Sequence, residues 1–383
     1  MLHDIKTIFH LIIIFQCLFF SCYILSQKND RRLSNIILAA FLLSKALTEI
    51  GGVLAHYEEL KMFIYSYAPQ MFYIGSPFRY LYVPMLFLYV LSITKRNFHF
   101  KKVYLFHFTP FLLISALFML RFRIDSADTL REILRTGSLL TFFEQLVFDF
   151  LENTQFFIYA IASLIVLKRY RTQIKNIYST IEHIDLAWLN FVIFGFIGWK
   201  SLRFLDLVLW LTFGNNVSYN VILYIMAEIV FLIFVSLMFF KGIKQPAIFL
   251  GYDGNKSRRK YEKTPLADAV REDYENKLLQ YMEKQKPYLE PSLCLNDLAK
   301  KVAIAPHHIS QVLNASLNQN FYDFINSYRI KECQLLLSKQ NPSKKTILEI
   351  LYQIGFNSKS AFNTAFKKHT GMTPTQFRKF KNS

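Results

Sequence analysis

Long apolar runs alternate with short polar segments along the first 240 residues. About 18 or more consecutive apolar residues are enough to cross a lipid bilayer as a helix. Runs near this length occur seven times, and the fifth is the shortest. They are Ile8–Ser26, Leu33–His56, Phe72–Thr94, Val103–Leu120, Gln155–Lys168, Leu186–Thr212 and Tyr219–Phe240. The pattern predicts an all-α bundle of seven transmembrane helices in contact with the lipid bilayer. Gly195 and Gly198 in the sixth run favour close helix packing.

The pattern changes after Lys241. A stretch with glycines, two prolines and the basic run Lys256–Lys260 is typical of a linker. Apolar residues then recur every four positions in the segment LADAVREDYENKLLQYMEKQ, at Leu266, Val270, Tyr274, Leu278 and Met282. This stripe predicts an amphipathic helix that must bury one side. It can pack on the domain that follows or against the same helix of a second chain, as a homodimer.

The segment LNDLAKKVAIAPHHISQVLNASL predicts two short helices joined by a turn. Leu295 and Leu298 face inward in the first helix, the AIA tripeptide forms the turn, and Pro306 opens the second helix, where its missing N–H costs nothing. Ile309 and Val312 face inward in the second helix. The outward residues are His307, His308, Ser310, Gln311 and Asn314.

A second pair of helices is predicted near the C-terminus, after a connecting helix with a broad apolar face, FYDFINSYRIKECQLLL. Gly355 supplies the turn between the two helices, because a positive φ is cheap for glycine. Asn357 or Ser358 caps the last helix of the pair. Its inward residues are Ala361, Phe362, Ala365 and Phe366. The residues left facing outward are Lys359, Ser360, Asn363, Thr364 and Lys367. Arg329 in the connecting helix is expected to be structural or to face phosphate.

The charge of the chain is concentrated in its C-terminal part. Residues 241–383 contain 24 Lys and Arg against 12 Asp and Glu, which gives +12 of the total charge of +18. A basic domain suits a polyanion, most simply nucleic acid. A solubilising role, or contact with a membrane surface, explains the same excess, so charge alone does not decide between these readings.

Neither metal sites nor enzyme motifs are indicated. The four cysteines are not spaced as metal ligands, and the adjacent His307 and His308 point about 100° apart on a helix. No phosphate-binding glycine loop or nucleophile motif occurs. We therefore expect a protein that is not an enzyme and that needs no cofactor.

The C-terminal motifs resemble a known family. The pattern LNDLA, ISQVLN, FYDFINSYRI and ILEILYQIGFNSKSAFNTAFKKHTGMTPTQFR is similar to the DNA-binding domain of AraC-family bacterial transcription regulators, over about 95 residues. The resemblance implies two helix-turn-helix units, joined by a linker helix, that place one helix each in successive major-groove segments of promoter DNA. Two departures are Leu351, where the family usually has alanine, and the absence of glycine from SLNQNF. The N-terminal half looks like the membrane-bound subgroup.

By position, the resemblance and the outward faces together give a set of expected DNA-binding residues. In the first unit these are His307, His308, Ser310, Gln311 and Asn314. In the second unit they are Ser358, Lys359, Ser360, Asn363, Thr364 and Lys367. Asn and Thr can bond base edges, whereas Lys and Ser suit phosphates and guanine acceptors.

Basic residues in the loops predict the orientation of the bundle. The loops after the first, third and fifth runs contain eleven, and the opposite loops show no such excess. They are Lys28, Arg31 and Arg32, then Lys95, Arg96, Lys101 and Lys102, and then Lys168, Arg169, Arg171 and Lys175. By the positive-inside rule, the N-terminus lies outside and the C-terminal domain lies in the cytoplasm. We expect a multi-pass protein of the bacterial inner membrane.

Several ionisable residues fall inside the predicted spans. Charges in hydrocarbon are costly, so they usually face the bundle interior and form pairs. We expect Lys200 and Arg203 to meet Asp206 or Glu228. The cluster either fixes the bundle through ion pairs or senses a small ligand or other signal. Its residues are Lys45, Glu49, Lys200, Arg203, Asp206 and Glu228.

These expectations divide the chain into three parts. Residues 1–242 are a seven-span sensor, residues 243–287 a linker with an amphipathic helix, and residues 288–383 an AraC-type DNA-binding domain. The expected function is that of a membrane-integrated transcription regulator controlled by a signal at the bundle. The alternative is a membrane receptor or transporter whose C-terminal domain acts through protein contacts.

Overall fold

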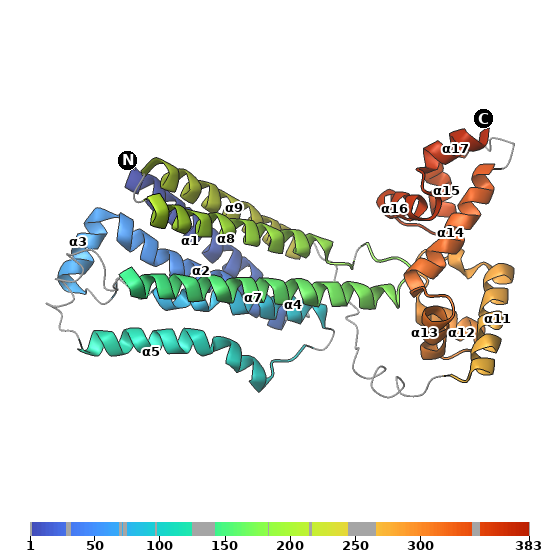
Figure 1. The fold of residues 1–383 in the computed structure, drawn as a ribbon, viewed down its shortest axis with the longest axis horizontal. Coiled ribbons are helices and arrows are strands. Elements are labelled where there is room, and N and C mark those ends of the chain that lie inside the picture. The colour runs from blue at the N-terminus through green and yellow to red at the C-terminus, as the bar shows by residue number, and fades with distance from the viewer. Residues whose placement is uncertain are drawn as a thin grey trace. The chain divides into compact units, whose positions relative to one another are not determined.

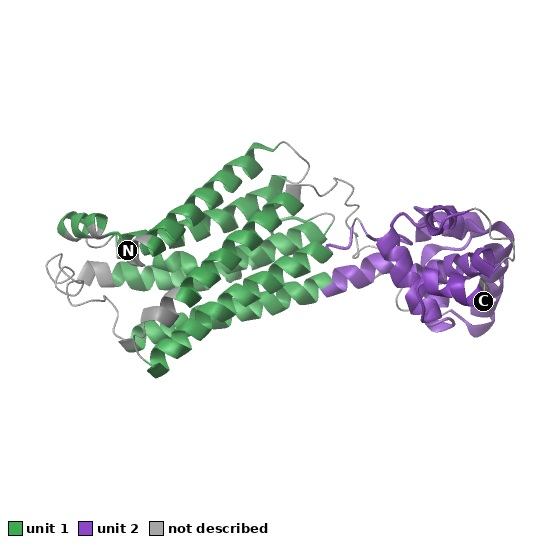
Figure 2. Cartoon of the chain, turned by 90° about the horizontal axis from the view of Figure 1, so that it is seen from above, with its two compact units in different colours: residues 1–167, 187–251 green, residues 168–186, 252–383 purple. Residues whose placement is uncertain are grey.

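A computed structural model describes most of the chain. It covers residues 2–27, 32–68, 71, 75–95, 98–124, 142–182, 184–213, 217–243, 266–338 and 345–382. Within these ranges the secondary structure is helical, apart from one isolated bridge between Tyr178 and Cys294. The chain separates into two compact units (Figure 2). Unit 1 comprises residues 1–167 and 187–251, and unit 2 comprises residues 168–186 and 252–383.

Unit 1 is built from long helices (Figure 1). Within it α1 packs along α2, α2 against α4, and α8 along α9. The helices are α1 (Leu2–Ser26), α2 (Arg32–His56), α3 (Glu58–Tyr67), the 3-10 helix η2 (Ser76–Tyr80), α4 (Tyr82–Thr94), the 3-10 helix η3 (Lys102–Phe108), α5 (Thr109–Ile124), α7 (Phe142–Lys175), α8 (Ala187–Phe213) and α9 (Val217–Ile243).

Six helical segments in the described residues are long and apolar enough to cross a membrane, judged by length and composition alone. They correspond to the first five predicted runs and the seventh. The sixth run forms α8, which is helical over 27 residues but contains Lys200, Arg203 and Asp206. The predicted number of seven spans is therefore not established, although the all-α fold is confirmed.

The predicted start of the fifth run at Gln155 is wrong. Helix α7 begins at Phe142 and extends over 34 residues, so part of the predicted outer loop is helical. Its first three turns contain Glu144, Asp149 and Glu152, and these charges interrupt the apolar run in the sequence. Helix α3, between the second and third runs, was also not predicted.

Aromatic side chains pack the interior of unit 1. Phe20 of α1 stacks on Phe239 of α9, with ring centroids 3.8 Å apart. A Cβ atom on Gly195 would lie 2.1 Å from the Phe234 ring, which confirms that this glycine allows close packing of α8 on α9. The same prediction for Gly198 is wrong, since nothing lies within 4 Å of a Cβ there.

Large apolar side chains also cover the outside of unit 1. Exposed fractions exceed two thirds at Phe15, Phe106, Met119, Phe143 and Phe213. Scattered exposed apolar residues are normal in water-soluble proteins, but extensive apolar surface marks an interaction with another apolar phase. These faces suggest insertion into a membrane.

Unit 2 contains the end of α7 (residues 168–175), the segment that follows it, and eight further helices in the described C-terminal residues. The eight are α11 (Asp268–Gln285), the 3-10 helix η4 (Pro287–Leu289), α12 (Leu295–Val302), α13 (Pro306–Ala315), α14 (Phe321–Ser338), α15 (Ile347–Gln353), α16 (Lys359–Thr370) and α17 (Pro374–Asn382).

Two hydrophobic cores lie along the connecting helix α14. Phe321, Phe324 and Ile325, near its start, join a core with α11, α12 and α13. Cys333 and Leu337, near its end, join a core with α15, α16 and α17. The predicted connector between two small units is confirmed. Figure 1 shows α13 and α16 packed near opposite ends of α14.

The predicted amphipathic stripe of α11 is buried only in part. Leu278 and Met282 are buried in the first core of unit 2, and Tyr274 packs against the same core. Val270 stays exposed. The second half of α11 therefore packs within its own chain, and the homodimer stays a prediction.

Candidate DNA-binding surface and buried polar network

The first pair of short helices is α12 and α13. The backbone N–H and the thiol of Cys294 both donate to the Asp297 carboxylate at the start of α12. Ala303 takes a left-handed conformation, with φ of 53°, and this residue turns the chain from α12 toward α13. Pro306 is at the start of α13, as predicted. Leu298 and Val312 are fully buried, so the predicted inward faces are confirmed.

The outward face of α13 is only partly open. Asn314 is exposed, whereas His307, His308, Ser310 and Gln311 are half-buried. The His308 ring lies 5.5 Å from the Tyr274 ring of α11. Burial and the neighbouring His308 lower the pKa of His307 below its usual 6.5. At neutral pH this histidine therefore contributes hydrogen bonds rather than charge.

Helix α15 begins with a capping box. The Thr346 hydroxyl accepts from the backbone N–H of Glu349, and the Glu349 carboxylate accepts from the backbone N–H of Thr346 at 2.6 Å. This reciprocal pair satisfies two of the free donors at the helix start. Gly355 then turns the chain with φ of 89°, which confirms the predicted glycine turn.

Helix α16 has the predicted cap and the predicted faces. Ser358, rather than Asn357, caps the helix by accepting from the Ala361 N–H at 3.1 Å. Gly371 ends it with φ of 75°. The four inward residues are buried, and the five outward residues are exposed: Lys359, Ser360, Asn363, Thr364 and Lys367.

One outward side chain on each of α16 and α13 donates a hydrogen bond within its own helix. Thr364 donates to the Ser360 carbonyl at 2.9 Å, and Asn314 donates to the Ser310 carbonyl at 2.7 Å. Lys359, Asn363 and Lys367 are exposed on the same side of α16. The exposed face of α16 therefore offers cationic and amide groups of the kinds that contact phosphates and base edges.

Arg329 is structural. Its side chain is 0% exposed, which excludes contact with phosphate in this arrangement. The guanidinium donates to the carbonyls of Tyr288 and Glu290, at 2.7 and 2.8 Å. Burial lowers the pKa of Arg329 to about 10, so it stays protonated at neutral pH.

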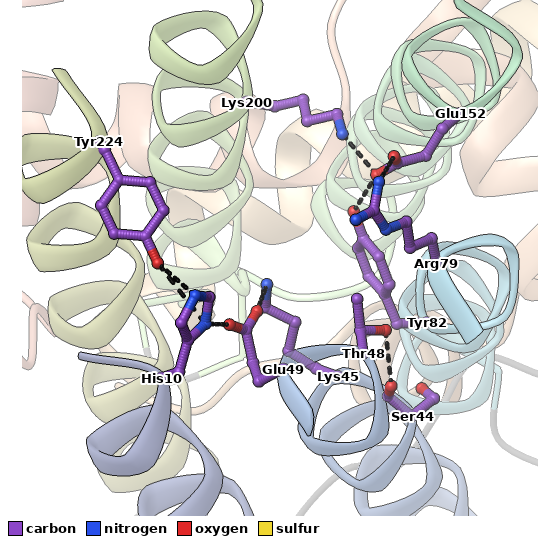
Figure 3. A network of polar contacts seen from close by, with 10 residues as sticks. All are labelled: His10, Ser44, Lys45, Thr48, Glu49, Arg79, Tyr82, Glu152, Lys200 and Tyr224. Atoms are coloured by element: carbon purple, nitrogen blue, oxygen red, sulfur yellow. Dashed lines mark hydrogen bonds and ion pairs between the residues drawn. The ribbon is translucent and has the colours of Figure 1, made fainter. Parts of the chain in front are cut away.

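A network of polar side chains crosses the interior of unit 1 (Figure 3). Lys45 and Glu49, one turn apart on α2, form an ion pair. The same Glu49 carboxylate lies 2.5 Å from Nδ1 of His10 on α1. Nε2 of His10 lies 2.9 Å from the hydroxyl of Tyr224 on α9. Three helices therefore meet at one buried chain of contacts.

The second part of the network centres on Glu152. Lys200 of α8 pairs with Glu152 of α7 at 2.5 Å, and Arg79 lies 3.9 Å from the same carboxylate. Lys200 was expected to meet Asp206 or Glu228, and that partner assignment is wrong. Arg203 pairs with Asp206 within α8, at 3.9 Å. Figure 3 draws Glu152 between Lys200 and the Arg79 side chain.

His10, Glu152 and Tyr224 are not among the residues that the sequence predicts for this cluster. His10 lies in the first apolar run, where a histidine is uncommon, and this is the signal in the sequence that points to it. Glu152 lies three residues before the predicted start of the fifth run at Gln155, so it falls outside the predicted spans. In the structure α7 begins at Phe142, so Glu152 lies within this helix, where it pairs with Lys200 of α8.

Glu228 of α9 is a further buried carboxylate in unit 1. It is 3% exposed, and its Oε2 atom makes no hydrogen bond to any residue that the structure describes. In these same residues no group of three or more potential ligands is placed to hold a metal ion. All four cysteines are free thiols.

Comparisons with known proteins match the C-terminal part of the chain. Residues 298–379 match the family model described as a helix-turn-helix domain. The Msm operon regulatory protein of Streptococcus mutans is 38% identical over 88 residues, which is 23% of this chain and 31% of that protein. The melibiose operon regulatory protein of Escherichia coli is 31% identical over 90 residues, 24% of this chain and 29% of that protein.

An uncharacterized HTH-type transcriptional regulator of Staphylococcus aureus is 31% identical over 109 residues, 28% of this chain and 14% of that protein. The chain thus spans less than a third of the length of these relatives. No solved structure matches the chain significantly. The relatives are named as regulators rather than enzymes, in agreement with the sequence expectation. The match and the paired short helices on α14 identify the C-terminal part of the chain as a helix-turn-helix domain of the AraC type.

Proposed function

We propose that the chain is a membrane-integrated transcription regulator that binds promoter DNA through α13 and α16. The exposed face of α16 carries this proposal. Lys359, Asn363 and Lys367 lie on it, while Phe362 and Phe366 hold the opposite face in the core. Such a face combines phosphate-binding and base-reading groups on a helix that is fixed in position.

The proposal includes the membrane and its orientation. The apolar outer surface of unit 1 and its long helices support insertion into the inner membrane of a bacterium. The eleven basic residues of the predicted inner loops support an outside N-terminus and a cytoplasmic C-terminal domain. The helix-turn-helix domain is then on the side of the membrane where the chromosome lies.

The proposal also assigns sensing to the buried network of unit 1. Three charged residues are buried on two helices of the bundle: Lys45, Glu49 and Glu228. Burying a charge inside a membrane bundle costs free energy, whether or not the charge is paired. A signal that changes their pairing would shift the bundle between two states, to the extent that it favours one of them. Binding of an unidentified small molecule, or another signal, would alter promoter binding in this way.

DNA binding is tested with the full chain in lipid nanodiscs. Genomic fragments that it retains are identified, and their affinity is measured across a range of salt concentrations. Lys359→Ala should reduce the slope of log affinity against log salt by about one. Asn363→Ala should cost about 1–3 kcal/mol and relax the sequence preference at one half-site.

The matched control for Lys359→Ala is Lys284→Ala, which removes the same charge from an exposed position on α11. This control should leave the salt slope near that of the wild type. If the full chain retains no DNA fragment at low salt, the proposal is wrong, and the C-terminal domain acts through protein contacts.

Sensing is tested with a reporter fused to a promoter identified in this way. Glu228→Gln removes a buried charge and should change reporter output at equal protein abundance. The control is Glu59→Gln, at an exposed position on α3. Equal output from both variants and the wild type, in every growth condition that alters the wild-type output, would refute a sensing role for Glu228.

A further inference from the structure

The segment after α7 pairs with the beginning of α12 inside unit 2. The backbone N–H of Leu295 donates to the Ile177 carbonyl at 2.8 Å, and the N–H of Ser179 donates to the Leu293 carbonyl at 3.2 Å. These two bonds form the antiparallel bridge between Tyr178 and Cys294. We call residues 176–182 the docking segment. They are more than 100 positions away from their partners in the sequence.

Side chains of the docking segment strengthen this pairing. The Ser179 hydroxyl donates to the Leu293 carbonyl at 2.7 Å, and the Thr180 hydroxyl donates to the Pro291 carbonyl at 2.7 Å. Ser179 is 1% exposed, so it lies within the unit rather than on its surface. Every residue of this contact belongs to one compact unit, although the two bridged segments lie far apart in the sequence, around Tyr178 and Cys294.

The docking segment also completes the hydrogen bonding of Arg329. A guanidinium has five N–H donors and no acceptor. Three bonds go to Tyr288, Glu290 and Asn326. The other two go to the carbonyl and the hydroxyl of Ser179, at 3.4 and 3.3 Å. Without the segment, two donors of a fully buried cation would lose their partners, which is costly.

Arg329 sits at the centre of the connecting helix between the two helix-turn-helix units. The Tyr288 carbonyl that accepts from it is also close to the turn of the second unit, since a Cβ on Gly355 would lie 2.9 Å from this oxygen. The docking segment itself holds the first residue of α12, in the first unit. The docking segment and Arg329 therefore link three elements of unit 2: α12, α14 and the turn between α15 and α16.

We propose that the docking segment holds the two helix-turn-helix units in their DNA-binding arrangement, so that its release lowers promoter affinity. This inference rests on the proposed DNA-binding function. Two reading helices must reach successive major-groove segments together, so affinity depends on their relative position. Helix α7 gives unit 1 a direct means of control, because residues 142–167 of this helix belong to unit 1 and residues 168–175 to unit 2.

The test uses the full chain in nanodiscs and a promoter fragment that the wild type retains. Ser179→Ala removes one bond to Leu293 and one to Arg329, and we expect roughly tenfold weaker binding to the promoter. Binding to random DNA at low salt should be unchanged, because it depends on phosphate contacts. The control is Thr172→Ala, whose exposed hydroxyl donates only to the Lys168 carbonyl of its own helix.

A second variant tests the docked state directly. Tyr178 and Cys294 form the non-hydrogen-bonded type of antiparallel pair, in which opposite side chains are closest. Tyr178→Cys should therefore form a disulfide with the native Cys294 on mild oxidation. The oxidised protein should bind the promoter at least as tightly as the wild type. The same variant combined with Cys294→Ser should not respond to oxidation.

The outcomes separate the two proposals. If the wild type binds no promoter, the proposed function fails. If the wild type binds but Ser179→Ala binds equally well, or if the oxidised Tyr178→Cys protein loses promoter binding, the docking proposal fails. Faster hydrogen exchange at the Leu295 amide in Ser179→Ala, together with weaker promoter binding, supports the proposal. Unchanged exchange at this amide overturns it.

Discussion

Gly355 provides a sharp test of how the second helix-turn-helix unit is held. Its φ of 89° lies in the left-handed region, and a Cβ there would lie 2.8 Å from the Leu289 carbonyl oxygen and 2.9 Å from that of Tyr288. Gly371 has a similar φ of 75°, but nothing lies within 4 Å of its Cβ position. The two glycines thus share the backbone conformation and differ in the space around them.

The difference between them can be given a magnitude. A non-glycine residue in the left-handed region costs about 1–2 kcal/mol, and this applies to both positions. At Gly355 the added methyl group must also displace backbone atoms, and such overpacking costs about 1–3 kcal/mol more. We expect Gly355→Ala to destabilise the second unit by about 2–5 kcal/mol, against about 1–2 kcal/mol for Gly371→Ala.

Hydrogen exchange of the full chain measures this difference. Amides of α16 exchange through opening of the unit, so their rates report its local stability. Relative to Gly371→Ala, the Gly355→Ala variant should exchange roughly tenfold to a hundredfold faster in α16. Equal acceleration in both variants would refute the argument, because it would mean that the carbonyls of Tyr288 and Leu289 do not restrict this turn.

Three further predictions concern individual side chains. Hydrogen bonds from Thr346 lower the pKa of Glu349. The stabilisation by the Glu349 carboxylate is therefore present above the usual carboxyl pKa of 4.5 and is lost as pH falls through the lowered pKa. Below pH 4.5 the Tm of the wild type should fall more than that of Glu349→Gln. Burial raises the pKa of Cys333 to about 12, so mass spectrometry should find it unmodified by iodoacetamide until the protein unfolds. Lys200→Met should destabilise unit 1 by about 3–5 kcal/mol in thermal melts, and adding Glu152→Gln should restore part of this loss.

The helix-turn-helix units were predictable in detail because their determinants are local. In α16 the alternation of small or aromatic residues with polar ones fixes which face is buried, and Ser358 and Gly371 mark its ends. Helix spacing follows from covalent geometry alone, so neighbouring residues in the sequence are enough to define the outward face.

The start of α7 depended on tertiary contacts. The sequence places Glu152 outside the predicted span, because three carboxylates, Glu144, Asp149 and Glu152, interrupt the apolar pattern before Gln155. In the fold Lys200, 48 positions away, neutralises it inside the bundle. The charge is tolerated only because of a partner that no local pattern could indicate.

The sequence by itself thus determined the all-α fold class, the inward and outward faces of the short helices, and the basic character of the C-terminal part. Only the tertiary structure decided that Ser179 completes the bonding of Arg329, 150 positions away. It also decided that α11 covers part of α13 through Tyr274. The physical reason is the same in both cases. Backbone groups supply much of the bonding of residues 176–182, and a tyrosine ring can pack on many kinds of neighbour, so residue type alone does not determine the partner.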